Sequence, residues 1–181
     1  RRNSWAGVRF AARIVDHRQR MVNASAHAVF ESIQRLGGEH GWPIANSLWR
    51  LRGAIDMVLG GVGMRRGRPA RSYLIPGDAL DFWRVERLER DRRLTLVAEM
   101  KLPGRAWLDF EIEERGDGCV LRQSAIFDPL GLSGQIYWYG LYPMHEIIFS
   151  GMIDFLARRA EREDKEQGQM ESDDSHDPSL V

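Results

Sequence analysis

The sequence predicts one α+β domain of the helix-grip type, in which a curved antiparallel sheet packs against a long C-terminal helix. Segments between residues 77 and 127 alternate apolar and polar residues and are separated by turn sequences, a pattern typical of a β-meander. The segment 143–163 instead carries apolar residues three or four positions apart, which is typical of an amphipathic helix. A meandering sheet with helices gathered on one side defines the α+β class.

Composition limits the partners and the compartment. The chain has 181 residues, which suits one domain with a real core. Lys+Arg and Asp+Glu both number 26, so there is no basic surplus, and we expect neither nucleic acid nor a membrane as a partner. Cys119 is the only cysteine, which excludes an intramolecular disulfide and favours a reducing, cytoplasmic compartment. No apolar run reaches the roughly 20 residues that cross a bilayer.

The two ends of the chain differ in composition from the middle. We expect residues 1–12 to form a linker or arm and residues 13–163 to form the domain. Residues 164–181 are too polar to bury a core, so they are predicted to be a disordered tail. Because the sequence begins without Met, we expect it to be part of a longer protein.

Before the meander, the pattern predicts one strand and two helices. Residues 13–23 form a polar strand suited to a sheet edge, and Ser25 can cap a helix that follows it. A second helix is expected at about 46–59. The glycine-rich segment 60–71 matches neither nucleotide-binding fingerprint, so we interpret it as a connector. The alternative is contact with an anion through one of three arginines: Arg65, Arg66 or Arg68.

The segment 77–104 organises the rest of the prediction. Residues 78–89 and 93–100 are predicted to be two strands joined by a charged hairpin. Alternation places Asp81 and Trp83 on one face of the first strand, where a carboxylate beside an indole suits a polar group in an apolar concavity. Alternation sends Glu99 away from that face unless a β-bulge intervenes.

The last two strands and the final helix complete the expected cavity. Residues 106–112 and 119–127 are predicted to pair through a Gly-Asp-Gly turn, with Gln123 among apolar neighbours, where its amide needs partners. The final helix is expected from Pro143 to about Glu163. Its apolar face would cover the hairpin and consists of His145, Ile148, Met152 and Phe155.

Five segments carry a resemblance to a known family. They are GGxxGW (37–42), LWRLRGAIDMVLGGVGMRRGR (48–68), GDALDFWRVE (77–86), AEMKLPGRAWLDF (98–110) and YWYGLYPMHEIIF (137–149). Together they resemble a bacterial domain family of unknown function in the START-like, or SRPBCC, superfamily. The resemblance covers about residues 12–160.

The resemblance implies a helix-grip fold with a deep apolar pocket, but no known catalytic residues. Domains of this family usually follow an NmrA-like, atypical short-chain-dehydrogenase domain that binds NAD(P). We therefore expect a Rossmann-like domain N-terminal to this chain in the full-length protein. The chain itself lacks GxGxxG, so no cofactor is assigned to it.

His145 is the sharpest candidate for chemistry, because an imidazole facing a cavity can accept, donate or shuttle a proton near neutral pH. With Asp81 it would form an acid/base pair if the two side chains came within about 3 Å. The predicted ligand-binding set is Asp81, Trp83, Gln123, His145, Tyr137, Tyr139 and Met152. No two histidines have the H-x-x-x-H spacing, so no metal site is expected.

Three functions remain open from the sequence. The first is a module that binds a hydrophobic or aromatic small molecule and serves a dinucleotide-binding partner domain. The second is a cyclase- or hydrolase-like enzyme that uses His145 with Asp81 or Gln123, by analogy of fold alone. The third is a structural or dimerisation domain with a filled core. We favour the first function, with no catalysis by this domain alone.

Overall fold

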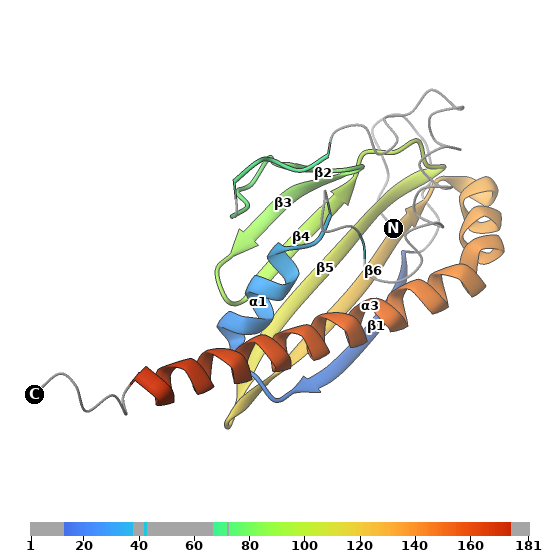
Figure 1. The fold of residues 1–181 in the computed structure, drawn as a ribbon. Coiled ribbons are helices and arrows are strands. Elements are labelled where there is room, and N and C mark those ends of the chain that lie inside the picture. Colours follow the sequence, from blue (N-terminus) through green and yellow to red (C-terminus); the bar gives the residue numbers. More distant parts are fainter. Residues whose placement is uncertain (1–12, 38–41, 43–66, 72, 175–181) are drawn as a thin grey trace, which may run out of the picture.

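The computed structural model describes residues 13–37, 42, 67–71 and 73–174 of the chain (Figure 1). Its elements are β1 (Ile14–Val22), α1 (Ala26–Gln34), β2 (Ala79–Leu80), β3 (Trp83–Glu89), β4 (Arg93–Ala98), β5 (Gly104–Arg115), β6 (Gly118–Pro129) and α3 (Gly131–Asp174). The predicted linker 1–12, the helix at 46–59 and residues 60–66 of the connector lie outside the described residues.

The strands form one antiparallel sheet in the order β1-β6-β5-β4-β3-β2. Five of them follow one another as a meander, and β1 pairs beside the last of them, so it occupies one edge as predicted. Figure 1 shows the sheet curving, with α1 and the long helix α3 on the same side of it. The predicted α+β helix-grip architecture is confirmed.

Alternation along the strands decides which side chains enter the core. On β6 the buried side chains include Leu121, Gln123, Ala125 and Phe127, whereas the residues that alternate with them (Arg122, Ser124 and Ile126) are only partly buried. Leu108 and Phe110 on β5 lie opposite this row and are fully buried. The sheet therefore presents one apolar face to the helices, as the period of two requires.

The N-terminal helix follows the prediction closely. The Ser25 side chain accepts a hydrogen bond from the Ala28 backbone N–H at 3.2 Å, which caps the first turn of α1. Val29 and Ile33 are fully buried one turn apart, so this short helix is anchored by its apolar stripe.

Helix α3 is longer than predicted at both ends. It begins at Gly131, so Pro143 lies inside the helix rather than in its first turn. Proline removes one helical hydrogen bond and crowds the preceding turn, and Figure 1 shows α3 bending sharply in its first half.

The C-terminal end of α3 also differs from the prediction. The helix passes Glu163 and continues to Asp174, so residues 164–174 are helical rather than a tail without structure. Their Glu, Lys and Gln residues are good helix formers and need no burial to stay helical. Phe155, predicted on the buried face, is 38% exposed and has the Arg159 guanidinium over its ring.

The segment 78–89 is not one continuous strand. A turn at Asp81 and Phe82 separates β2 from β3, and Asp81 has a φ of 56°. Asp tolerates this left-handed conformation better than most residues. The turn removes Asp81 from the strand face that it was predicted to share with Trp83. In the part of the chain that the structure describes, no helix is long and apolar enough to span a membrane.

Candidate functional site: an apolar pocket between the sheet and helix α3

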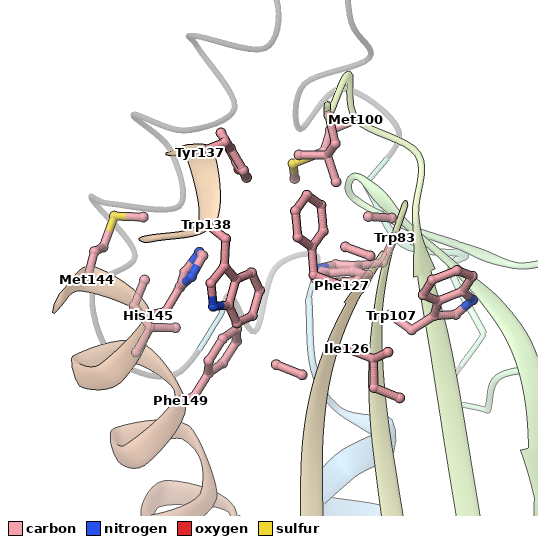
Figure 2. Close-up of a pocket in the computed structure, with 15 residues that line it drawn as sticks. Trp83, Met100, Trp107, Ile126, Phe127, Tyr137, Trp138, Met144, His145 and Phe149 are labelled. Atoms are coloured by element: carbon pink, nitrogen blue, oxygen red, sulfur yellow. The ribbon is translucent and has the colours of Figure 1, made fainter. Parts of the chain in front are cut away.

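The candidate site is a pocket between the inner face of the sheet and the first half of α3 (Figure 2). The pocket holds about 600 Å³ of empty space, part of which is open to solvent, and the centre of a water-sized sphere can occupy about 60 Å³ of it. A single water needs roughly 10–15 Å³ on the second scale, so the pocket has room for more than one water-sized group. The described residues that line it are Trp83, Ala98, Met100, Leu102, Ala106, Trp107, Ala125, Ile126, Phe127, Tyr137, Trp138, Met144, His145, Ile148 and Phe149.

Small side chains explain why space remains at this point of the core. Ala98, Ala106 and Ala125 come from β4, β5 and β6 and all line the pocket. Each lies opposite a larger residue in the neighbouring strand: Ala98 faces Trp83, and Ala106 faces Phe127. Three alanines on adjacent strands therefore leave a depression in the apolar face of the sheet.

A continuous row of rings forms the wall on the α3 side. The Phe127 ring on β6 stacks on the Trp138 ring, with 5.5 Å between the ring centroids and an interplanar angle of 12°. The Tyr137 ring also contacts the Phe127 ring, with 5.8 Å between the centroids. Trp138 meets His145 at 4.9 Å, and His145 stacks on Phe149 at 5.4 Å. Such contacts fix the rings and present flat apolar surfaces to the pocket.

His145 lies in the pocket wall, as the helix face predicted, but Asp81 does not. The Asp81 Oδ2 atom instead accepts a hydrogen bond from Trp42 Nε1 at 2.8 Å, and the residue is only 4% exposed. Gly37, with a φ of 77°, packs against this carboxylate; a Cβ there would lie 3.2 Å from Asp81 Oδ2. The Asp81 carboxylate therefore lies against Trp42 and Gly37, and Asp81 is not among the described residues that line the pocket with His145.

The other predicted ligand residues divide into two groups. Trp83 and Tyr137 line the pocket, whereas Gln123, Tyr139 and Met152 do not. Gln123 is 1% exposed and uses its Nε2 atom to donate to the Phe149 carbonyl at 3.0 Å, which ties β6 to α3. Met152 is fully buried and Tyr139 is 65% exposed, so the first packs in the core and the second faces outward.

Glu99 stays outside the pocket, in the direction that strict alternation gives. Its carboxylate receives two hydrogen bonds from Arg84, at 2.6 and 3.1 Å. The bulge in this hairpin lies between Val85 and Arg87 in β3 and leaves the direction of Glu99 unchanged. The pair explains why the pKa of Arg84 is raised, chiefly by its hydrogen bonds to Glu99.

The predicted ligand-binding set left out several lining residues, above all Phe127, Trp138 and Phe149. It also missed the three alanines that create the space. Their shared signal was present in the sequence, because Ala98, Ala106 and Ala125 all occupy inward positions of their strands. Small residues at inward positions of adjacent strands are a sign of a cavity in a sheet that faces a helix.

Neither metal nor thiol chemistry fits the described part of the chain. Among these residues, no group of three or more His, Cys, Asp or Glu side chains could hold a metal ion. Cys119 is fully buried, and burial raises the pKa of its thiol to about 11. The thiol is therefore neutral at physiological pH and a poor nucleophile.

One polar group in the pocket stands out. Trp83 is 5% exposed, and its indole Nε1 donates no hydrogen bond. Across the described lining, no Asp, Glu, Lys or Arg side chain is present. The site thus combines aromatic and aliphatic walls with very few polar atoms, which suits an uncharged apolar molecule.

The fold and the pocket together define a helix-grip domain with an apolar cavity under its long helix. The chain belongs to the family described as "Protein of unknown function (DUF2867)", which matches residues 10–152. No curated protein matches the sequence.

Solved structures of similar fold share little sequence with this chain. Protein NE0264 from Nitrosomonas europaea is 12% identical with a TM-score of 0.50, covering 83% of this chain and 96% of that one. Protein CV1439 from Chromobacterium violaceum is 11% identical with a TM-score of 0.45, covering 81% and 96%. Truncated norcoclaurine synthase from Thalictrum flavum is 11% identical with a TM-score of 0.49, covering 81% and 92%. At this identity the likeness to protein NE0264, whose TM-score reaches 0.50, concerns the fold alone.

Proposed function

We propose that this domain binds a small hydrophobic or aromatic molecule between its sheet and helix α3. The observation that carries the proposal is the depression left by Ala98, Ala106 and Ala125 under the aromatic wall. A protein interior is normally close-packed, and a void of this size leaves its lining without contacts. An apolar occupant would restore those contacts and would remove the pocket's apolar surface from water.

The first experiment asks whether the purified domain carries a ligand. Native mass spectrometry of the protein, followed by extraction and mass analysis of any released molecule, gives the mass and class of an occupant. A neutral, apolar adduct that dissociates on denaturation supports the proposal. If no adduct is found, titration with neutral aromatic probes, followed by thermal unfolding, replaces the search.

A pocket-filling variant ties binding to this site. Ala98→Phe places a large side chain in the pocket, so it should abolish binding of an apolar probe. The matched control is Val97→Phe, which makes a similar change at the next residue of β4, outside the pocket lining. If Ala98→Phe folds and binds as well as the wild type, the pocket is not the binding site and the proposal fails. If neither the wild type nor Val97→Phe binds any apolar probe, a structural domain with a filled core becomes the better description.

A finer part of the proposal concerns the full-length protein. We propose that the domain presents or retains the ligand for an N-terminal NAD(P)-binding domain of the NmrA-like, short-chain-dehydrogenase type. What supports it is the resemblance carried by the five sequence segments quoted above. The upstream coding sequence tests it, because a GxxGxxG-type loop between a strand and a helix is expected there. A coding region with no such loop would rule out this partner and leave the binding proposal in place.

A further inference from the structure

The indole nitrogen of Trp83 is a buried hydrogen-bond donor with no acceptor. A buried unsatisfied donor costs roughly 1–3 kcal/mol, so a native protein rarely keeps one without a reason. The neighbouring indole of Trp42 shows the usual solution, since its Nε1 donates to Asp81 at 2.8 Å. Of these two adjacent indoles, only the one that lines the pocket is left unsatisfied.

The Trp83 ring is held in place by its neighbours. Its centroid lies 5.6 Å from that of the Phe82 ring and 6.4 Å from that of the Trp42 ring. The Trp83 backbone pairs with Ala98 of β4. Figure 2 shows the ring lying next to Phe127, with its nitrogen directed toward the α3 side of the pocket. A ring fixed in this way cannot turn to find an acceptor elsewhere, so a partner must enter the pocket.

Chemistry restricts what that partner is. An indole N–H donates and cannot accept, so the partner must present an acceptor. The described lining holds no charged side chain of the Asp, Glu, Lys or Arg type, and an ion placed there would lose its hydration without compensation. A hydroxyl or primary amide would also bring a donor, which would need a second partner such as the imidazole of His145 in the lining. A ketone or ester carbonyl meets the requirement alone.

We propose that the ligand is a neutral, flat, apolar carbonyl compound whose oxygen accepts a hydrogen bond from Trp83 Nε1. The ring system lies against the stacked rings of Phe127 and Trp138. This inference rests on the proposed function, because it names the chemical class of molecule that the pocket binds. Trp83 is then the residue that selects carbonyl compounds over hydrocarbons of the same shape.

Two probes of nearly the same shape separate this inference from binding itself. Indane is a bicyclic hydrocarbon, and 1-indanone differs from it by one carbonyl group. Affinities of both probes are measured by isothermal titration calorimetry for the wild type and for Trp83→Phe. The wild type should bind 1-indanone roughly twofold to tenfold more tightly than indane, the range expected for one net hydrogen bond. In Trp83→Phe that preference should disappear, while indane still binds, because phenylalanine keeps an apolar ring without the N–H.

A second measurement works on the wild type alone, in case the variant does not fold. In ¹⁵N-labelled protein the indole N–H resonance of Trp83 should move downfield with 1-indanone and much less with indane. The Trp42 indole, which already donates to Asp81, is the internal control and should move little with either probe.

The outcomes are distinct. Equal affinity for both probes in the wild type, or a preference for 1-indanone that survives in Trp83→Phe, overturns the role of Trp83 and leaves apolar binding intact. An indole N–H resonance of Trp83 that shifts equally with both probes would also overturn the role of Trp83 and leave apolar binding intact. Binding of neither probe overturns the proposed function and this inference together.

Discussion

Replacing Gly134 by alanine tests how the first turn of α3 is fixed over the pocket. A Cβ at this position would lie 2.4 Å from the Pro103 carbonyl oxygen, 2.7 Å from Pro129 Cβ and 2.9 Å from Pro129 Cα. The Pro103 carbonyl also accepts a hydrogen bond from the Leu130 backbone N–H at 2.8 Å, so it is not free to move away. The new methyl group must therefore push the helix away from the sheet.

The expected magnitude comes from two opposing effects. Alanine favours the helix over glycine by about 1 kcal/mol, and overpacking of a close contact costs roughly 1–3 kcal/mol. Because the contact distances at Gly134 are far below van der Waals separation, we expect a net loss of about 2 kcal/mol. Gly140 in the same helix has no atom within 4 Å of an added Cβ, so Gly140→Ala should raise stability by about 1 kcal/mol.

Urea denaturation followed by far-UV circular dichroism measures both changes in the free energy of unfolding. Equal m-values in the two variants would show that the unfolded states are comparable. Gly134→Ala should also weaken binding of an apolar probe, because Tyr137 and Trp138 follow Gly134 by one turn and line the pocket. The reasoning is refuted if Gly134→Ala stabilises the protein as much as Gly140→Ala does.

Three further predictions concern buried polar groups. Stability should fall as the pH rises from about 9 to 11. Burial raises the pKa of the Cys119 thiol from 9.0 to about 11, so in this pH range the folded state retains a proton that the unfolded state loses. Cys119→Ala should flatten that part of a pH series of urea denaturation curves. Gln123→Met should change the free energy of unfolding by less than about 1 kcal/mol. The substitution removes the donor to the Phe149 carbonyl, but it also removes a buried Oε1 atom that has no hydrogen-bond partner, and the two effects offset each other. A loss above 3 kcal/mol in thermal or urea unfolding would contradict this. Trp42→Phe should destabilise the protein by roughly 1–3 kcal/mol, because it removes the indole donor to the buried Asp81 carboxylate, and Asp81→Asn combined with it should recover part of the loss.

The strands could be predicted because their signal is local. In residues 94–98, 106–112 and 119–127 apolar residues recur at most second positions, and each segment lies in the strand that this pattern predicts. The cap at Ser25 was equally local, since a serine before an apolar stripe is enough to start a helix. The family segments then added what no local pattern contains, which is the way α3 lies across the sheet.

The start of α3 could not be predicted by the same means. In the sequence, Pro143 indicates a helix start, because its ring is tolerated in the first turn of a helix and disfavoured inside one. In the folded protein the preceding turns pack on the sheet through Trp138, which is 4% exposed. This tertiary contact outweighs the lost hydrogen bond.

The site shows the limit of face assignments. Trp83 and His145 were placed correctly by periodicity, but Asp81 was assigned to a strand that turns at that residue. In the run of Tyr137, Trp138 and Tyr139, helical geometry turns each residue about 100° from the last, so only two of the three line the pocket. A cluster of three aromatic residues does not reveal which two face inward until the helix bounds are known.

The pairing of β1 with β6 has a consequence for how fast the domain folds. His17 on β1 and Ser124 on β6 share a hydrogen bond at 2.9 Å although they are 107 residues apart in the chain. The meander from β2 to β6 can form from neighbouring hairpins, but the β1 edge can close only after a loop of this length has been ordered. Contacts of such separation raise the contact order, so the domain should fold more slowly than a helical bundle of similar size. During synthesis β1 can therefore pair only after most of the domain has been made, and its backbone groups form no sheet hydrogen bonds until β6 has been synthesised.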